Sequence, residues 1–223
     1  MRATIVSFYT PQYYVHLADF MSSVHAFRLQ MEVEKLPTRG SWRLNCGFKP
    51  RFMLKMIERF GPCVWLDIDA RVKEYPALFD ELVETSIDFA TYFIPNKYMR
   101  PSDVPLGEAS RNPGLASGTM FFNDTEAAKE LLHRWIGHDR GQHSAEQFVL
   151  GEAWHLYEKE IGLHTRGLPQ AYCKVFDQAY REGEHGPDVI EHLQASRKLR
   201  GLVNRQSRTK RSRSRKGQVG AKR

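Results

Sequence analysis

The chain has 223 residues, of which 41% are hydrophobic and 12% aromatic, so it is long enough for one domain with a packed core. No stretch approaches the roughly 18 apolar residues of a membrane span, and Met1–Phe20 lacks the apolar run and cleavage site of a signal peptide. Cys46, Cys63 and Cys173 are widely spaced, without a Cys-x-x-Cys pair, which argues against a zinc ribbon or a disulfide framework. These features predict a soluble, cytoplasmic protein with reduced thiols.

Charge is distributed unevenly along the chain. The net charge is +7, yet residues 197–223 contain 12 Lys and Arg and no Asp or Glu. The remaining 21 basic and 26 acidic residues give the rest of the chain a charge of −5. We therefore expect one folded domain over residues 1–200 and a disordered, low-complexity basic tail over residues 201–223. Such a tail is commonly only solvated, but it can also contact nucleic acid or anionic membrane lipids.

Hydrophobic periodicity predicts that strands and helices alternate along the chain. In chain order, the pattern predicts a strand over residues 3–9, helices over 14–31 and 48–60, a strand over 64–72, a helix over 75–82, strands over 87–93 and 115–122, a helix over 126–135, and a further helix capped by Ser144. Pro95–Pro113 is rich in Pro, Gly, Asn and Ser and predicts a long surface loop.

The most informative stretch is the apolar run that contains Asp67 and Asp69. Because side chains alternate along a strand, these two carboxylates should project to one side while Ile68 points to the other. In an open α/β sheet, ligands bind beyond the carboxyl ends of the strands, and paired acids there suit a divalent cation. Asp-x-Asp also occurs at helix caps and turns, so the interpretation depends on the residues around it. Our hypothesis is that the cation holds a nucleotide diphosphate.

Further polar groups stand near predicted element ends. Tyr9, Thr10 and Tyr13 follow the first strand and are candidates to stack on or hydrogen-bond a pyrimidine, although tyrosines at such positions are often packing residues. Lys49 and Arg51 lie in the first turn of a predicted helix, where phosphate is attracted, although single basic residues are usually solvated.

Histidines differ in their surroundings. His192 follows an apolar pair and precedes a Ser-Arg-Lys cluster, which makes it a better ligand candidate than most single histidines. His133, His138 and His143 recur every five residues, which is not the spacing of a metal site on one helix face, and we expect them at the surface. Gly118, in the strand that precedes Asn123, would let a ligand approach the backbone closely.

Taken together, these motifs resemble nucleotide-sugar glycosyltransferases of the GT-A fold. The resemblance covers about residues 1–200 and rests on the order and spacing of Lys49-Pro50, Asp67-Ile68-Asp69, residues 117–123, Glu146-Gln147 and His192. It implies a Rossmann-like α/β domain with a mixed, mostly parallel central sheet flanked by helices. It also implies a divalent ion, usually Mn²⁺ (or Mg²⁺), and a nucleotide-sugar donor, with a UDP-sugar expected.

The resemblance also implies roles for single residues. Asp69 would be the direct metal ligand, Asp67 would contact ribose or metal, and His192 would complete the coordination. Glu146 and Gln147 stand where many relatives have Asp-Gln, close to donor sugar and acceptor, and no Lys-Pro-Trp follows His192. The other expected donor-binding residues are Ser7, Tyr9, Thr10, Lys49, which would face the phosphates, Ser117 and Gly118, which would lie along the sugar, and Arg197.

The chemistry expected from this set is glycosyl transfer. Negative charge develops on the departing diphosphate, and a metal ion with adjacent cations stabilises that charge. An inverting enzyme would also need a carboxylate base for the acceptor hydroxyl, for which Glu146 is the first candidate; a retaining enzyme would need none. The sequence leaves both courses open.

Three other classes of protein share features with this sequence. A phosphatase of the haloacid dehalogenase type also has an apolar strand ending in Asp-x-Asp, but it requires a later Lys and an acidic pair, and no Asp-Asp occurs here. The basic tail suggests a nucleic-acid-binding module, but the acidic charge of the folded domain argues that nucleic-acid binding is not its main function. An inactive transferase fold that serves as a scaffold is the third.

Overall fold

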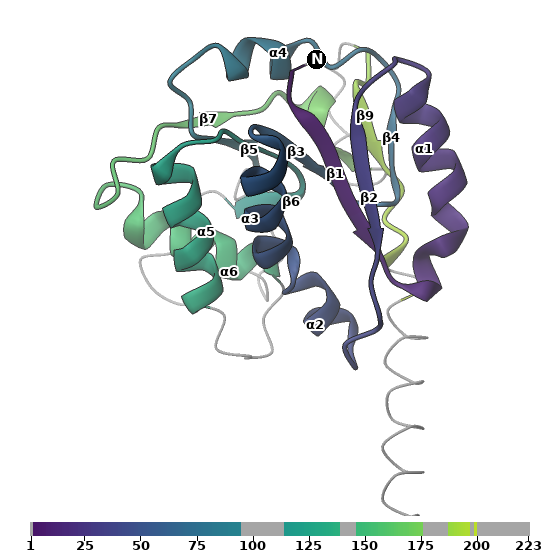
Figure 1. Cartoon of the computed structure of the whole chain (residues 1–223), viewed down its shortest axis with the longest axis horizontal. Coiled ribbons are helices and arrows are strands. Elements are labelled where there is room, and N and C mark those ends of the chain that lie inside the picture. The colour runs from purple at the N-terminus through teal and green to yellow at the C-terminus, as the bar shows by residue number, and fades with distance from the viewer. Residues whose placement is uncertain (1, 95–113, 139–145, 176–186, 197–198, 200–223) are drawn as a thin grey trace, which may run out of the picture.

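The computed structural model describes residues 2–94, 114–138, 146–175, 187–196 and 199 (Figure 1). The predictions for Pro95–Pro113, His143, Ser144, Arg197 and the tail over residues 201–223 lie outside these described residues. No described helix combines the length and the apolar character needed to cross a membrane.

The described chain contains both strands and helices, and most of the predicted elements are found. The strands are β1 (Thr4–Tyr9), β2 (Met31–Lys35), β3 (Cys63–Leu66), β4 (Ala70–Val72), β5 (Phe89–Ile94), β6 (Gly114–Phe122), β7 (Thr165–Gly167), β8 (Lys174–Val175) and β9 (Ile190–His192). The helices are α1 (Leu17–His25), α2 (Trp42–Cys46), α3 (Lys49–Phe60), α4 (Leu78–Val83), α5 (Glu126–His138) and α6 (Glu146–Tyr157), with the 3₁₀ turns η1 (Pro11–His16) and η5 (Gln170–Tyr172).

A mixed six-stranded sheet forms the centre of the domain. Its strand order is β2-β1-β3-β6-β5-β7. The pairs β1–β2, β1–β3 and β5–β7 are parallel, and the β6 strand pairs antiparallel to β3 and β5. Helices flank the sheet, as Figure 1 shows. The predicted α/β class with a mixed, mostly parallel sheet is therefore confirmed.

Both faces of the sheet are buried, and β3 shows how. Cys63 and Trp65 pack into the core beneath α3, α5 and α6, whereas Val64 and Leu66 pack into the core beneath α1 and α4. A strand covered on both faces must be apolar throughout, which explains the continuous hydrophobic run before Asp67. Polar side chains become accessible only where this strand ends.

The α3 helix sets the position at which β3 begins. One side of the helix buries Phe52, Met53, Met56 and Ile57 against the sheet. The chain then turns at Gly61, whose φ of +75° is a conformation that glycine adopts without the cost of a side chain. The amino end of α3, which begins with Lys49, therefore lies at the same edge of the sheet as the carboxyl end of β3.

A second, three-stranded sheet has the order β4-β9-β8. The β4 and β9 strands pair antiparallel, with Ala70 opposite His192. This pairing joins segments that are more than 120 residues apart in sequence and places His192 beside the residue that follows Asp69. The second sheet therefore brings the late histidine to the acidic pair.

The predicted helix over residues 14–31 is wrong in its extent. The chain forms the turn η1 and then α1, which ends at His25. Arg28 has a φ of +55°, a left-handed conformation that ends helices, and the chain then reverses into β2. The sequence Met31-Glu32-Val33-Glu34-Lys35 alternates as an edge strand does, but the apolar periodicity before it masked this signal.

The single strand predicted over residues 64–72 is also wrong. Strand β3 ends at Leu66, and β4 begins at Ala70 in the other sheet. The backbone N–H of Ala70 donates to the carbonyl of Asp67 over 2.7 Å, which closes a turn around Asp67-Ile68-Asp69. The two aspartates consequently come together through this turn and not through strand alternation.

Thr125 fixes the start of α5 against the end of β6. Its Oγ1 donates to Asp88 Oδ1 over 2.6 Å and accepts from the backbone N–H of Ala128 over 3.2 Å. Asp88 also accepts from the backbone N–H of His164 over 2.8 Å, so one buried carboxylate joins two segments.

We expect Thr125→Ala to lower the free energy of unfolding by about 1–2 kcal/mol, because it removes a helix cap and a hydrogen bond to a buried carboxylate. Thr125→Ser keeps the hydroxyl and should retain most of the stability. The free energy of unfolding of both variants is measured by urea denaturation, monitored by circular dichroism. An Ala variant as stable as the wild type would contradict this assignment.

Candidate metal and donor site

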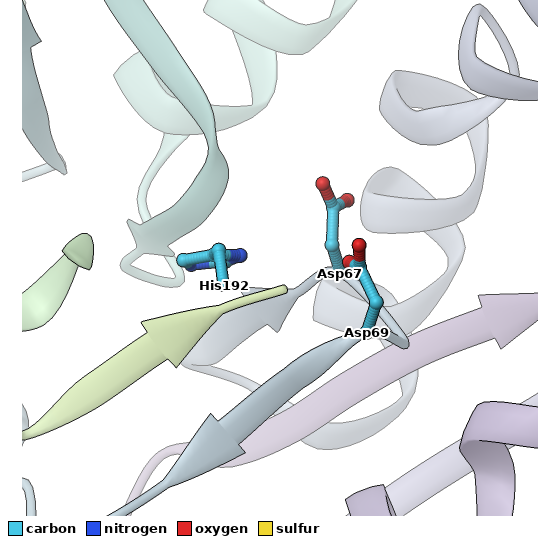
Figure 2. Close-up of side chains that lie close together, drawn as sticks. All are labelled: Asp67, Asp69 and His192. Atoms are coloured by element: carbon cyan, nitrogen blue, oxygen red, sulfur yellow. The ribbon is translucent and has the colours of Figure 1, made fainter. Parts of the chain in front are cut away.

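Two aspartates and one histidine meet at the edge of the central sheet. Asp67 and Asp69 come from the β3–β4 turn, and His192 ends β9 (Figure 2). One ligand atom from each residue lies within 4.8 Å of the ligand atoms of the other two. Within the described ranges, no other set of His, Cys, Asp and Glu side chains forms such a group. The convergence of Asp67, Asp69 and His192 that the sequence predicts is therefore found.

The Asp69 carboxylate is buried and fastens the end of the described chain. Its Oδ2 accepts from the backbone N–H of Ala195 over 2.7 Å, and its backbone carbonyl accepts from the N–H of Leu193 over 3.2 Å. These two bonds hold the segment after β9 against the β3–β4 turn. Oδ1 receives no hydrogen bond from the described residues, which leaves it able to bind a cation.

His192 is held in place by residues of β6. A ring nitrogen, Nε2, lies 2.8 Å from Thr119 Oγ1, and the ring is buried. A hydrogen bond from one imidazole nitrogen to a protein group is the usual way in which the other nitrogen is oriented toward a metal. Figure 2 shows a ring nitrogen on the side of the two aspartates.

Gly118 makes room for this histidine. A Cβ atom at Gly118 would lie 2.9 Å from His192 Cε1, which is closer than real Cβ contacts come, and 3.1 Å from Nδ1. The carbonyl of Gly118 also accepts from the backbone N–H of Asp67 over 2.9 Å. The sequence predicts that glycine here admits a ligand to the backbone, and in the structure the space next to Gly118 is filled by the His192 ring.

Lys49 is a buried cation with three protein acceptors. Its Nζ lies 2.8 Å from Asp67 Oδ1, 2.9 Å from Glu146 Oε1 and 3.1 Å from the carbonyl of Ser117. The Ser117 hydroxyl donates to the same Glu146 oxygen over 3.0 Å. The ammonium has three hydrogens, so all of them are used within the protein. Lys49 thus links Asp67 to Glu146, and its expected contact with phosphate stays a prediction.

Burial and charge together set the protonation of these groups. Burial opposes the charge of Lys49, but the Asp67 and Glu146 carboxylates outweigh it, so the pKa of Lys49 lies above its usual value. Burial raises the pKa of Glu146, but Lys49 and the Ser117 hydroxyl lower it by more. The pKa therefore lies below its usual value, and this carboxylate is ionised at neutral pH. Burial lowers the pKa of His192, which favours the neutral ring that binds metals.

Asp67 behaves differently from Glu146. Loss of hydration is the largest influence and raises the pKa of Asp67, the charge of Asp69 adds to this rise, and Lys49 opposes it. The side chain is nevertheless 35% exposed, so solvent screens part of the effect. Two carboxylates this close repel each other, and a divalent cation between them removes the repulsion.

The ligand chemistry of the group fits a divalent cation. Two carboxylates supply hard oxygen donors of the kind that Mg²⁺ and Mn²⁺ prefer, and a neutral imidazole is compatible with Mn²⁺. Each aspartate has one carboxylate oxygen without a hydrogen bond from the described residues. Asp67, Asp69 and His192 can therefore hold a metal ion.

The predicted donor-binding residues of β1 lie at the same edge of the sheet. Because β1 and β3 are parallel neighbours, with Val6 opposite Trp65, residues 7–10 stand beside the carboxyl end of β3. The hydroxyls of Ser7 and Thr10 are buried and have no hydrogen-bond partner among the described residues. Buried polar atoms without partners are costly, and binding of a polar ligand would satisfy them.

Other predicted donor residues have less defined surroundings. Tyr9 is half-buried, and its ring lies 6.0 Å from that of Tyr14. Gln147 follows Glu146 in α6 and is partly exposed. The roles assigned to these residues stay predictions.

Two residues of the site were not predicted from the sequence. Trp65 Nε1 donates to Asp67 Oδ1 over 3.0 Å, and Thr119 Oγ1 lies 2.8 Å from His192 Nε2. The proximity of Trp65 to Asp67 could have been predicted, since residues two apart on a strand share a face. The contact of Thr119 with His192 could not, because it depends on long-range strand pairing.

The similarity of this chain to known proteins lies in its fold and not in its sequence. No protein-family model matches the sequence, and no curated protein sequence matches it. Several solved structures share its fold. A glycosyltransferase involved in glycosylation of the major capsid of PBCV-1 matches with a TM-score of 0.61 and 14% identity, over 93% of this chain and 98% of that one.

Two further matches come from other proteins. Mouse xyloside xylosyltransferase 1 matches with a TM-score of 0.54 and 11% identity, over 87% of this chain and 98% of that one. The galactosyltransferase LgtC, solved with donor and acceptor sugar analogs, matches with a TM-score of 0.51 and 14% identity, over 85% of this chain and 86% of that one. At such identities the similarity establishes the fold, and the GT-A fold implied by the sequence motifs is confirmed.

We expect Gly118→Ala to weaken Mn²⁺ binding by roughly tenfold or more, because the new methyl group must displace the His192 ring. Isothermal titration calorimetry with MnCl₂ measures the affinity. The control is Gly137→Ala in α5, where a Cβ meets no atom within 4 Å. Equal Mn²⁺ affinity in the two variants would show that Gly118 does not position a metal ligand.

Proposed function

We propose that the protein is a metal-dependent glycosyltransferase that transfers a sugar from a nucleotide-diphosphate sugar, a UDP-sugar first among them, to an acceptor. The observation that carries the proposal is the Asp67–Asp69–His192 group at the carboxyl edge of a GT-A sheet. Mn²⁺ is the proposed ion, with Mg²⁺ as the alternative, because both accept carboxylate ligands and bind diphosphate oxygens.

The donor is proposed to lie along the edge of the sheet. The diphosphate would stand at the metal group, and the nucleoside would reach toward Ser7 and Thr10, whose buried hydroxyls lack partners among the described residues. The sugar would lie near Ser117 and Glu146, which are joined by a hydrogen bond. This arrangement follows the rule that ligands of open α/β sheets bind beyond the carboxyl ends of the strands.

Catalysis would depend on charge more than on proton transfer. When the bond between the anomeric carbon and the phosphate oxygen breaks, the electron pair stays on the diphosphate, and a bound divalent ion stabilises that charge. The task of Asp67, Asp69 and His192 is to hold the ion at one place. Lys49 adds a positive charge that is already fixed before the donor binds, so no reorganisation is needed during the reaction.

Glu146 fits the role of a carboxylate that accepts a hydroxyl hydrogen. Lys49 and Ser117 both bind Oε1, and in the proposed complex the other carboxylate oxygen accepts a hydrogen bond from a substrate hydroxyl. The lowered pKa of Glu146 keeps it ionised, as a hydrogen-bond acceptor or a base must be, but it also makes the carboxylate a weak base. Retention and inversion both remain compatible with this carboxylate.

Turnover of nucleotide sugars tests the proposal. A panel of UDP-, GDP-, ADP- and CMP-activated sugars is incubated with the protein, with MnCl₂ or with EDTA, and released nucleotide is measured. We expect release from a UDP-sugar that requires Mn²⁺, and we expect Asp69→Asn to reduce it on the order of 100-fold or more. Asp19→Asn is the control, because Asp19 is exposed and pairs only with Arg71 among the described residues.

The outcomes separate the rival functions. Metal-dependent nucleotide-sugar binding without any turnover would favour the inactive scaffold. Release of phosphate from phosphomonoesters with no action on nucleotide sugars would favour a phosphatase. Turnover that is the same in Asp69→Asn and Asp19→Asn would contradict the assigned site.

A second candidate function is nucleic-acid binding through the basic tail. Residues 197–223 carry 12 Lys and Arg without an acid, next to a body of charge −5. We expect the full chain to bind double-stranded DNA with an affinity that falls steeply with salt, and we expect removal of residues 201–223 to abolish this binding. Filter binding across a KCl series measures it. If the deletion variant binds DNA as well as the full chain does, the tail is not a DNA-binding segment. If the full chain binds anionic lipid vesicles but not DNA, the tail is a lipid-binding segment.

A further inference from the structure

The two oxygens of the Asp67 carboxylate have different surroundings. Oδ1 accepts from Trp65 Nε1 over 3.0 Å and from Lys49 Nζ over 2.8 Å. Oδ2 accepts no hydrogen bond from the described residues. An oxygen that already accepts two short bonds has little capacity left for a cation, so Oδ2 is the oxygen that can bind one.

The indole of Trp65 is fixed by the core. It is 1% exposed, and its ring centroid lies 5.0 Å from that of Phe8 and 5.9 Å from that of Phe52. A close-packed aromatic side chain cannot rotate without opening a void. Because the indole N–H is a donor only, its single hydrogen bond fixes the position of the Asp67 oxygen as well.

Lys49 is held mainly by groups other than Trp65. Its Nζ is held by Glu146 and by the carbonyl of Ser117, and it lies 5.3 Å from the centroid of the Trp65 ring. The two donors of Asp67 Oδ1 therefore come from different elements, β3 and α3, and neither depends on a ligand. The orientation of the Asp67 carboxylate is therefore fixed at Oδ1 in the absence of a bound ion.

We propose that Trp65 is a positioning residue of the metal site. Its indole N–H and Lys49 both donate to Asp67 Oδ1, so that Asp67 Oδ2 is the oxygen oriented to bind an ion together with Asp69 and His192. This inference rests on the proposed function, because it concerns the same ion. Its consequence is that Asp67 binds through one oxygen. Asp67, Asp69 and His192 would then hold the ion with one ligand atom each, and further ligands would come from the donor and from water.

The test is the affinity of the full chain for Mn²⁺ alone, measured from the free-ion signal in electron paramagnetic resonance. Trp65→Phe keeps an aromatic ring in the core and removes the N–H. We expect Trp65→Phe to bind Mn²⁺ roughly 10- to 100-fold more weakly than the wild type, as is found when an outer partner of a metal ligand is lost. The spectrum of the bound ion should also change, because Asp67 can then bind through either oxygen.

Two matched controls use the same substitution. Trp154→Phe removes an indole N–H that donates to Thr165 Oγ1 over 3.0 Å, away from the metal group. Trp135→Phe removes an indole that is as deeply buried as that of Trp65. Both should bind Mn²⁺ as the wild type does, and the comparison with Trp135→Phe accounts for any loss of packing.

A second measurement needs no change at Trp65. In wild-type protein labelled with ¹⁵N-tryptophan, the indole N–H resonance of Trp65 should shift when Mg²⁺ is added, whereas that of Trp154 should not. The Trp65 resonance is assigned by elimination, because Trp42→Phe, Trp135→Phe and Trp154→Phe each remove one of the other three indole signals. This measurement decides the matter if Trp65→Phe does not fold.

The possible outcomes are distinct. Trp65→Phe with the Mn²⁺ affinity of Trp154→Phe, or an unmoved Trp65 resonance in protein that binds Mg²⁺, would overturn the positioning role and leave the proposed function intact. A wild type that binds no Mn²⁺, or an Asp69→Asn variant that binds it equally well, would overturn both. Loss of affinity confined to Trp65→Phe, Asp69→Asn and Gly118→Ala supports both.

Discussion

A buried cation that has more than one acidic neighbour is the constraint on which the site depends. Lys49 is 3% exposed, and a charge buried this deeply is tolerated only when it is paired and hydrogen-bonded. Asp67 and Glu146 supply that pairing from two different elements, so the amino end of α3, the end of β3 and the start of α6 are tied to one point. Asp69 then adds another acid beside Asp67, and no cation of the described residues forms an ion pair with it.

The charges of this cluster explain why an ion is expected there. Three carboxylates, those of Asp67, Asp69 and Glu146, face one ammonium, while burial keeps His192 neutral. The group has an excess of negative charge when every carboxylate is ionised, and a divalent cation is the simplest partner for that excess. Burial is the main cause of the raised pKa of Asp67, Lys49 opposes the rise, and the neighbouring charge of Asp69 adds to it.

The sequence predicted the acidic pair and His192 because each follows an apolar stretch that had to be a strand. It could not show how they meet. Asp67 and Asp69 lie in a turn between two sheets, and the pairing of β4 with β9 joins distant segments whose register depends on long-range contacts. The prediction of one helix over residues 14–31 was wrong because the apolar spacing continues past Arg28, whose backbone is left-handed, into the edge strand β2. Trp65 and Gly118 were visible in the sequence, yet their effects on Asp67 and His192 require side-chain geometry.

The fold is shared with glycosyltransferases at 11–14% identity, so it is the site that must support the activity. The most direct measurement is a crystal structure of the protein with MnCl₂ and UDP, with anomalous data collected at the manganese edge. The result expected is an anomalous peak in contact with Asp67, Asp69 and His192, with diphosphate oxygens completing the coordination. A peak elsewhere, or UDP bound with no metal at these three residues, would contradict the proposed site.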